Sequence, residues 1–262
     1  MQTALHITAL VSDLQSEIVG GEIIGTEFYK KERAAFIYVK KGGRMVLGFS
    51  FHPTGAGSWL IPASKLKLTT REKPRPVFAI NSGRIAAVEQ LGTDRIFRLR
   101  IEQNDQFFWL LFEAIGPNGN IWRLDSENRR TDSLRRRQFE QGAKYQPLPP
   151  MDRLDPFDLD ADKLGEHLAR SGSGSLVVWM EKNLIGFSRT LAREAVTRAE
   201  LDFIAPDDVD PEGVARLTGV ITQIIGFFAK PATGYLYALP GGFEASPFKL
   251  SAREEQPERF KT

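Results

Sequence analysis

The sequence contains no cysteine and only three histidines, His6, His52 and His167, among its 262 residues. Without cysteine there is no disulfide bond and no thiolate-bound zinc or iron–sulfur site. The histidines stand far apart and form no recognisable spacing of metal ligands. We therefore predict neither a metal site nor a cofactor.

Long hydrophobic runs are also missing. No stretch approaches the roughly 20 consecutive apolar residues of a membrane-spanning helix. The first six residues have neither the basic start nor the apolar centre of a secretory signal. A hydrophobic content of 42% and a charged content of 26% are ordinary for a globular protein in water. We expect a cytoplasmic protein that has no membrane partner.

The common catalytic motifs are absent as well. The chain has no phosphate-binding P-loop, no Gly-x-Ser-x-Gly elbow, no His-Glu-x-x-His and no dinucleotide-binding glycine fingerprint after a strand. Carboxylates such as Glu89, Asp94, Glu102 and Glu113 show no spacing that requires an acid–base pair. The sequence therefore predicts a binding protein with no catalytic residue.

Charge is distributed unevenly along the chain. Residues 1–150 hold 22 lysines and arginines against 15 acidic residues, whereas residues 151–262 hold 13 against 18. A net charge of +7 on the first part indicates an anionic partner, and nucleic acid is the commonest one. The second part has a net charge of −5, which is consistent with a protein-binding role for that part.

Apolar periodicity predicts a helix and then strands in the first part. Apolar residues recur at spacings of three and four between residues 5 and 18, and Gly20-Gly21 ends this helix. Alternating or continuous apolar residues predict strands over 22–29, 34–40, 44–51, 85–91, 96–101, 107–112 and 121–124. The fold class is α+β, an antiparallel sheet or flattened barrel with an N-terminal helix.

The second part changes to a helical period. Prolines between residues 147 and 156 indicate a linker, so we predict one domain over 1–150 and another over 151–262. Helices are expected around 164–168, 176–182, 188–201 and 209–228, with Ser188 as an N-cap. A strand is expected at 234–238, and the polar tail beyond residue 250 is expected to be frayed.

One hairpin carries an acid beside an arginine. Gly92-Thr93 supply the tight turn, and Asp94 and Arg95 follow it. Strand alternation would place these two side chains on opposite faces. Charged residues beside a turn are commonly solvated and have no binding role. This pair is a candidate binding site only because of the motifs around it.

Six motifs, in order, resemble the N-terminal domain of the NFACT family of ribosome quality-control factors, long known as fibronectin-binding protein A-like. They are the helix and glycine stop at residues 14–23, Phe51-His52-Pro53, the hairpin from Gly83 to Ile96, Glu113-x-x-Gly116 with Asn120, Gly142-x-x-Tyr145 with Pro149, and residues 186–194, which resemble the start of a helix-hairpin-helix module.

The resemblance implies a fold like that of formamidopyrimidine-DNA glycosylases and a function in RNA binding. Family members bind the large ribosomal subunit and recruit tRNA to extend a stalled nascent chain, and the Asp-Arg pair is needed for the grip on tRNA. The resemblance thus implies tRNA and the large ribosomal subunit as partners. It assigns RNA contact to Asp94, Arg95, Glu113, Gly116 and Asn120, with Arg84, Arg135, Arg136 and Arg137 as weaker phosphate contacts.

The chain departs from the family pattern at two places. Residues 77–82 leave no room for the basic helix that usually precedes Gly83, and Pro117 and Gly119 replace the usual arginine and serine of the loop. Two alternatives remain open. One is a protein-docking module such as a fibronectin-binding adhesin. The other is a nucleic-acid binder of the DNA-glycosylase class, although Gln2-Thr3 stands where those enzymes carry a proline nucleophile.

Overall fold

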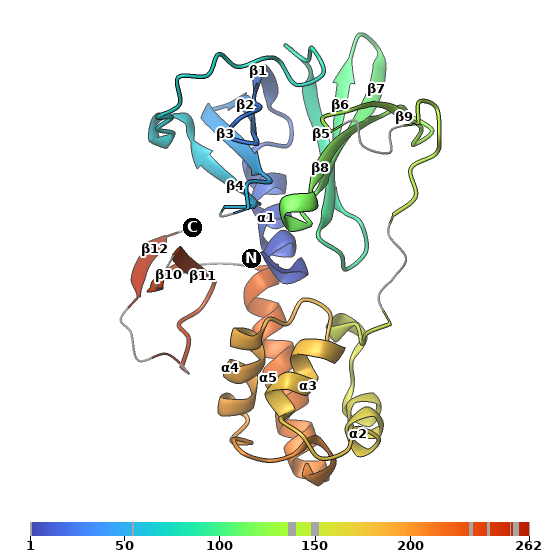
Figure 1. Ribbon diagram of the computed structural model, residues 1–262, viewed down its shortest axis with the longest axis vertical. Helices are drawn as coiled ribbons and strands as arrows, with labels where there is room; N and C mark the ends of the chain where they lie inside the picture. The colour runs from blue at the N-terminus through green and yellow to red at the C-terminus, as the bar shows by residue number, and fades with distance from the viewer. Residues whose placement is uncertain are drawn as a thin grey trace. The chain divides into compact units, whose positions relative to one another are not determined.

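The computed structural model describes residues 2–53, 55–135, 140–147, 152–230, 233–239, 242–251, 253 and 257–261. The chain divides into two compact units, residues 1–149 and 150–262, which are described separately below (Figure 1). The first unit combines one helix with an antiparallel sheet, and the second is mainly helical. The predicted α+β class is confirmed.

The described part of the first unit comprises one helix and nine strands. The sheet order is β4-β3-β2-β1-β5-β6-β7-β8-β9, and every neighbouring pair is antiparallel. The elements are α1 (Ala4–Glu17), β1 (Glu22–Tyr29), β2 (Ala34–Lys41), β3 (Gly43–Ser50), β4 (Gly57–Pro62), β5 (Arg84–Gln90), β6 (Ile96–Gln103), β7 (Gln106–Glu113), β8 (Asn120–Leu124) and β9 (Arg130–Ser133). Strands β4 and β9 were not expected from the sequence.

The sheet consists of two halves that share one apolar core. Strands β1 and β5 meet through a single residue pair, Glu22 and Arg84. The core nevertheless contains buried side chains from both halves and from α1. Phe112 lies in it 4.7 Å from Phe97, and the Phe49 ring of the other half is 5.6 Å from Phe112. Apolar burial therefore reinforces the short backbone contact between the halves.

Strand β7 is buried on both faces, as its continuous apolar sequence predicts. Phe108, Leu110 and Phe112 belong to the shared core, whereas Trp109 and Leu111 belong to a second apolar cluster. Tyr145, from the chain after β9, also lies in this second cluster. The second face of the strand is thus covered by a loop segment.

Both outer strands of the sheet have hydrogen-bonding groups beside them. The Gln2 side chain donates to the Ser58 carbonyl of β4 at 2.6 Å and accepts from the Ser58 amide at 2.8 Å. At the other end, the Arg130 amide donates to the Ala143 carbonyl and the Gly142 amide donates to the Arg130 carbonyl. These groups act in the manner of an additional strand.

The second unit contains α2 (Ala161–Ala169), α3 (Leu176–Asn183), α4 (Arg189–Arg198) and α5 (Pro211–Ala229). Side chains of Asp160, Ser188 and Asp210 accept hydrogen bonds from the first turns of α2, α4 and α5. Such caps satisfy amides that have no partner inside the helix, so they explain where these helices begin. No helix in the described residues is long and apolar enough to cross a membrane.

A small sheet follows the helices in the same unit. Strands β10 (Thr233–Leu239), β11 (Gly242–Ser246) and β12 (Glu258–Lys261) have the order β11-β10-β12. The expectation of a frayed tail was wrong, because residues 258–261 pair with β10. The tail lacks apolar alternation, and its partner strand lies about twenty residues earlier, so its local sequence carries no strand signal.

A buried carboxylate attaches the segment before β12 to helix α4. Glu194 is fully buried, and its Oε1 atom accepts from Arg198 Nε at 2.6 Å and from the Ser251 amide at 2.9 Å. Arg198 also donates to the Lys249 carbonyl and lies 4.9 Å from the centre of the Phe248 ring. One ion pair thereby fixes both a helix and a distant segment.

We expect Glu194→Ala to lower the free energy of unfolding of the helical unit by about 3 kcal/mol, because it leaves a largely buried guanidinium without its anion. Glu166→Ala is the matched control, since it removes the exposed Glu166–Arg170 pair and costs about 0.5 kcal/mol or less. Urea denaturation of both variants measures the difference. Equal losses would contradict the assigned role of Glu194.

Candidate functional site

The acid–arginine pair lies within the turn between β5 and β6. The sequence predicted a two-residue turn with Asp94 and Arg95 on the following strand, but β6 begins only at Ile96, so this placement was wrong. Gly92 has a φ of 58° and allows the longer connection. Asp94 and Arg95 therefore do not take opposite faces of a strand.

Hydrogen bonds hold this turn against helix α1. Gln90 Nε2 donates to the Asp94 carbonyl at 2.7 Å and to the Ala4 carbonyl at 3.2 Å, and Thr8 donates to Gln90 Oε1 at 2.8 Å. The Asp94 carboxylate accepts from the Arg95 amide at 2.6 Å. The turn is consequently tied both to itself and to the first turns of the helix.

Glu113 lies beside the turn at the end of β7. It pairs across the sheet with Ile96, and the next amide, that of Ala114, donates to the Arg95 carbonyl at 2.8 Å. The buried Tyr145 hydroxyl donates to Glu113 Oε1 at 2.9 Å. Burial and the negative charge of Glu113, with a further contribution from Asp94, raise the pKa of Tyr145. The structure thus brings Asp94, Arg95, Glu113 and Tyr145 together.

The loop after Glu113 is shaped by glycine and by a buried amide. Gly116 has a φ of 74° and opens a short 3₁₀ turn. A Cβ atom at Gly119 would lie 2.7 Å from the Glu113 carbonyl oxygen, so a side chain there requires the backbone to shift. Asn120 is buried, donates to Ser133 Oγ at 2.9 Å and accepts from the Arg135 amide at 2.9 Å. Asn120 serves the structure of the loop.

Arg135 closes the same loop from the other side. Its Nη1 atom donates to the carbonyls of Pro117 at 2.8 Å and Gly119 at 3.1 Å. Its guanidinium lies 5.2 Å from the centre of the Phe51 ring, in the other half of the sheet. Arg135 therefore orders the loop and links it to β3.

Two parts of the expected surface do not join this cluster. Arg84 is exposed at the opposite end of β5, about 20 Å from the turn at the usual rise per strand residue. Arg136 and Arg137 lie outside the described residues.

Two residues near the cluster had no assigned role in the sequence analysis. Gln90 anchors the turn, and Arg130 places its guanidinium 4.6 Å from the Trp122 ring and 5.6 Å from the Tyr145 ring. Arg130 is one of five arginines between residues 129 and 137, but only the fold reveals that this one lies against Trp122 and Tyr145. Gln90 has no sequence signal that separates it from any other strand-end residue.

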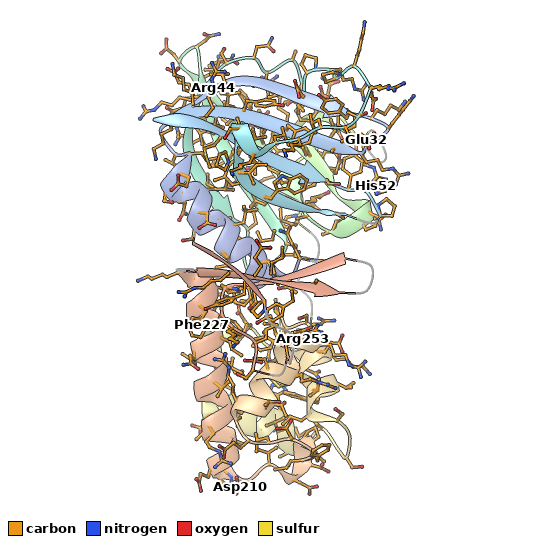
Figure 2. All side chains as sticks on the ribbon, turned by 90° about the vertical axis from the view of Figure 1, so that its left-hand side faces the viewer. Glu32, Arg44, His52, Asp210, Phe227 and Arg253 are labelled. Atoms are coloured by element: carbon orange, nitrogen blue, oxygen red, sulfur yellow. The ribbon has the colours of Figure 1, made fainter. Side chains whose placement is uncertain are left out.

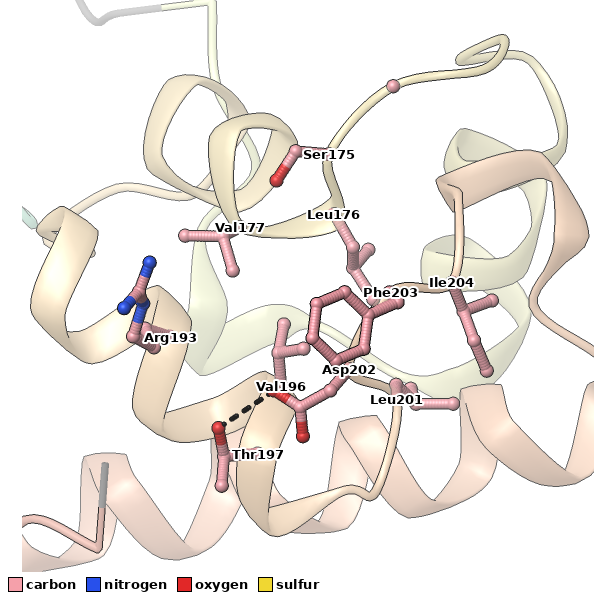
Figure 3. Close-up of a pocket in the computed structure, with 11 residues that line it drawn as sticks. Ser175, Leu176, Val177, Arg193, Val196, Thr197, Leu201, Asp202, Phe203 and Ile204 are labelled. Carbon is pink, nitrogen blue, oxygen red and sulfur yellow. Dashed lines mark hydrogen bonds between the residues drawn. The ribbon is translucent and has the colours of Figure 1, made fainter.

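A separate hollow of about 480 Å³ lies in the helical unit (Figure 3). Its wall is part apolar and part polar, and the polar side chains include Arg193 and the hydrogen-bonded pair Thr197 and Asp202. Phe203 is fully exposed at its rim, with a φ of 69°. Among the described residues, none of those expected to bind RNA lines this hollow.

Comparison with known proteins identifies the family. The family described as NFACT N-terminal and middle domains matches residues 3–261, and the chain belongs to this family. No curated protein matches the sequence significantly.

Solved structures share the fold at low sequence identity. The fibrinogen-binding protein from Staphylococcus aureus is 18% identical, with a TM-score of 0.77 over 99% of this chain and 95% of that one. The N-terminal part of the fibronectin/fibrinogen-binding protein from Streptococcus suis is 17% identical, with a TM-score of 0.71 over 98% and 94%. The N-terminal domain of fibronectin-binding protein PavA from Streptococcus pneumoniae is 18% identical, with a TM-score of 0.62 over 94% of each chain.

The raised pKa of Tyr145 predicts a loss of stability in alkali. A phenol whose pKa is higher in the folded than in the unfolded chain stabilises the fold below its ordinary pKa of about 10, and this contribution declines as the pH rises further. Tyr145→Phe should remove up to about 1.4 kcal/mol per pH unit of that decline. It should also cost about 1.5 kcal/mol at neutral pH, where the hydrogen bond to Glu113 is lost.

Urea denaturation of the wild type and Tyr145→Phe at neutral pH and above pH 10 measures both effects. Parallel pH dependences of the two proteins would contradict the coupling between Tyr145 and Glu113.

Proposed function

We propose that this chain is an RNA-binding domain that grips tRNA as part of a cytoplasmic, ribosome-associated quality-control factor, and that it acts by binding and not by catalysis. Membership of the NFACT family supports the class of function. The observation that carries the proposal is the Asp94–Arg95 turn, which is held at the Asp94 carbonyl by Gln90 and at the Arg95 carbonyl by Ala114. A binding element held at both residues loses little conformational entropy when RNA is bound.

The two side chains have complementary chemistry for RNA. A guanidinium donates through a planar fork to phosphate oxygens or to the edge of a guanine. A carboxylate accepts from base amino groups and from ribose 2′-hydroxyls, which are absent from DNA. In the proposal, Arg95 supplies binding strength, and Asp94 supplies the preference for RNA.

In this proposal, the surface beside the turn is shaped by four residues, namely Glu113, Gly116, Asn120 and Arg135. Asn120 and Arg135 direct their hydrogen bonds into the loop itself, so their substitution changes the position of the loop. Contact with the large ribosomal subunit is part of the proposed role, and family members carry further domains that share it. Binding through several domains multiplies affinity, so we expect residues 1–262 to bind more weakly than a chain that joins them to such domains.

The names of the structural relatives supply the competing hypothesis. Those proteins are called fibrinogen-binding or fibronectin-binding, so a protein-docking function for this chain is the alternative. The two hypotheses predict different ligands. A protein-docking module binds immobilised fibronectin and shows no salt-sensitive affinity for nucleic acid.

We expect Arg95→Ala to weaken tRNA binding by about 1–3 kcal/mol, because a forked contact is lost. Arg95→Lys should recover only part of this, since lysine keeps the charge without the fork. Asp94→Ala should reduce the preference for tRNA over duplex DNA of matched length. Arg170→Ala is the control, because it removes an exposed arginine of the helical unit to which no RNA contact is assigned.

Titration of labelled tRNA and duplex DNA with each variant at near-physiological salt measures these effects. The proposal fails if wild type and Arg95→Ala bind both nucleic acids equally, or if the wild type binds fibronectin but no tRNA.

A further inference from the structure

The positive charge of the first unit is concentrated away from the Asp94–Arg95 turn. Residues 22–76 hold 11 lysines and arginines against 4 acidic residues, whereas residues 77–150 hold 11 against 9. The half of the sheet formed by β1 to β4 and the segment after it therefore carries a net charge of +7. The half that contains the turn is close to balanced.

The cations of the two halves also differ in their partners. Arg98, Arg100 and Arg129, in the half that contains the turn, form ion pairs at 2.7, 3.5 and 2.9 Å. Within the described part of residues 22–76, no lysine or arginine forms an ion pair. Salt bridges inside the unit thus do not compensate this excess charge.

Two acidic side chains in this half of the sheet accept hydrogen bonds from neutral groups and, among the described residues, form no ion pair with a lysine or arginine. Glu27 Oε2 accepts from the hydroxyls of Tyr29 at 3.0 Å and Tyr38 at 2.7 Å. Glu72 accepts from the backbone amides of Lys30 at 3.0 Å and Lys31 at 2.8 Å. Both carboxylates hold the local structure in place.

Two of the cations stand directly opposite each other. Lys40 on β2 and Arg44 on β3 are cross-strand neighbours, and both are exposed. Figure 2 shows Arg44 at one end of this half of the sheet and His52 and Glu32 at the other. Like charges directly opposite each other destabilise a sheet, and an external anion would relieve this repulsion beside Glu22, the neighbour of Lys40 on β1.

The segment after β4 adds further cations and is anchored along its length. It leaves β4 at Pro62, which pairs with Met45 next to Arg44. Leu66 then packs on an apolar cluster of β1 to β4, and Arg75 exchanges hydrogen bonds with Phe28 at 2.7 and 3.2 Å. Between these anchors four cations are exposed, namely Lys65, Lys67, Arg71 and Lys73.

The apolar cluster under this segment does not have the form of a membrane-inserting surface. A Cβ atom at Gly48 would lie 2.3 Å from the Trp59 indole, so glycine lets this ring lie close against β3. The hydroxyls of Tyr29 and Tyr38 are bound to Glu27. Insertion into a membrane surface needs a row of exposed apolar side chains, whereas these rings lie against the protein and Leu68 is the one large apolar side chain exposed in residues 63–76.

We propose that Lys40, Arg44, Lys65, Lys67, Arg71 and Lys73, here called the basic track, bind the phosphate backbone of RNA. This inference rests on the proposed function and adds a second contact surface to it. Lys65 and Lys67, and again Arg71 and Lys73, are two residues apart, which is about 7 Å in extended chain. Regularly spaced cations suit a ligand whose negative charge repeats along a line, as it does in a nucleic-acid strand.

The track leads toward the end of the sheet that holds the turn. Through Glu72, the segment after β4 is hydrogen-bonded to the connection between β1 and β2. At this end of the sheet, Ala34 at the start of β2 pairs with Ser50 at the end of β3. Ser50 pairs with Gly57, and Gln2 joins the neighbouring Ser58 to the start of α1. The basic track thus supplies phosphate contacts without sequence information, and the Asp94–Arg95 turn supplies selectivity.

The test is the triple variant Lys65→Gln/Lys67→Gln/Lys73→Gln. These side chains are exposed, so melting temperatures should be unchanged. We expect tRNA affinity to fall by about tenfold or more, and the slope of log affinity against log salt to fall by about 2. Duplex DNA should lose affinity equally, so the preference for tRNA stays the same.

Lys163→Gln/Arg170→Gln/Lys182→Gln is the matched control, because it removes the same charge from exposed positions of the helical unit. The inference is overturned if the track variant behaves like this control while Arg95→Ala weakens tRNA binding, a result that leaves the proposed function standing. It is also overturned if the wild type binds phosphatidylglycerol vesicles or polyglutamate as tightly as tRNA. A wild type that binds no tRNA contradicts the proposed function itself.

Discussion

The first unit depends on one apolar core that two halves of a sheet share. Backbone pairing between the halves is confined to a few hydrogen bonds around Glu22 and Arg84, so side-chain burial supplies much of the cohesion. The candidate site extends across this junction, because Gly119 lies against Phe49 and the Arg135 guanidinium lies over Phe51. Packing between the halves therefore also sets the shape of the proposed RNA-binding surface.

The elements with strong local signals were predictable from the sequence. Alternating apolar residues predicted strands β1 to β3 and β5 to β8, and apolar spacing with capping residues predicted the helices. Strand β4 was missed because it begins at Gly57 and ends at Pro62, and β9 because its four residues are polar. Both become strands by pairing with a neighbour, and pairing is a non-local property.

The contacts of the candidate site were likewise hard to predict from the sequence, because they too are non-local. The family resemblance pointed to the turn and to the loop after Glu113, but it assigned Asn120 and Arg135 to contact with RNA. The fold gives Asn120 and Arg135 internal hydrogen bonds. Tyr145 reaches Glu113 from 32 residues further along the chain, and Gln90 also joins the turn to Ala4, 86 residues earlier, so the sequence alone does not reveal these contacts.

The hydrogen bonds of Gln2 to Ser58 have a consequence for the behaviour of the protein in solution. An open strand edge is a template for another chain, and long uncovered edges promote aggregation. At one end of the sheet a single side-chain amide occupies the edge at Ser58, and at the other end the backbone of residues 142 and 143 does so. Part of the protection against self-association at β4 thus comes from a residue outside the sheet, next to the first helix.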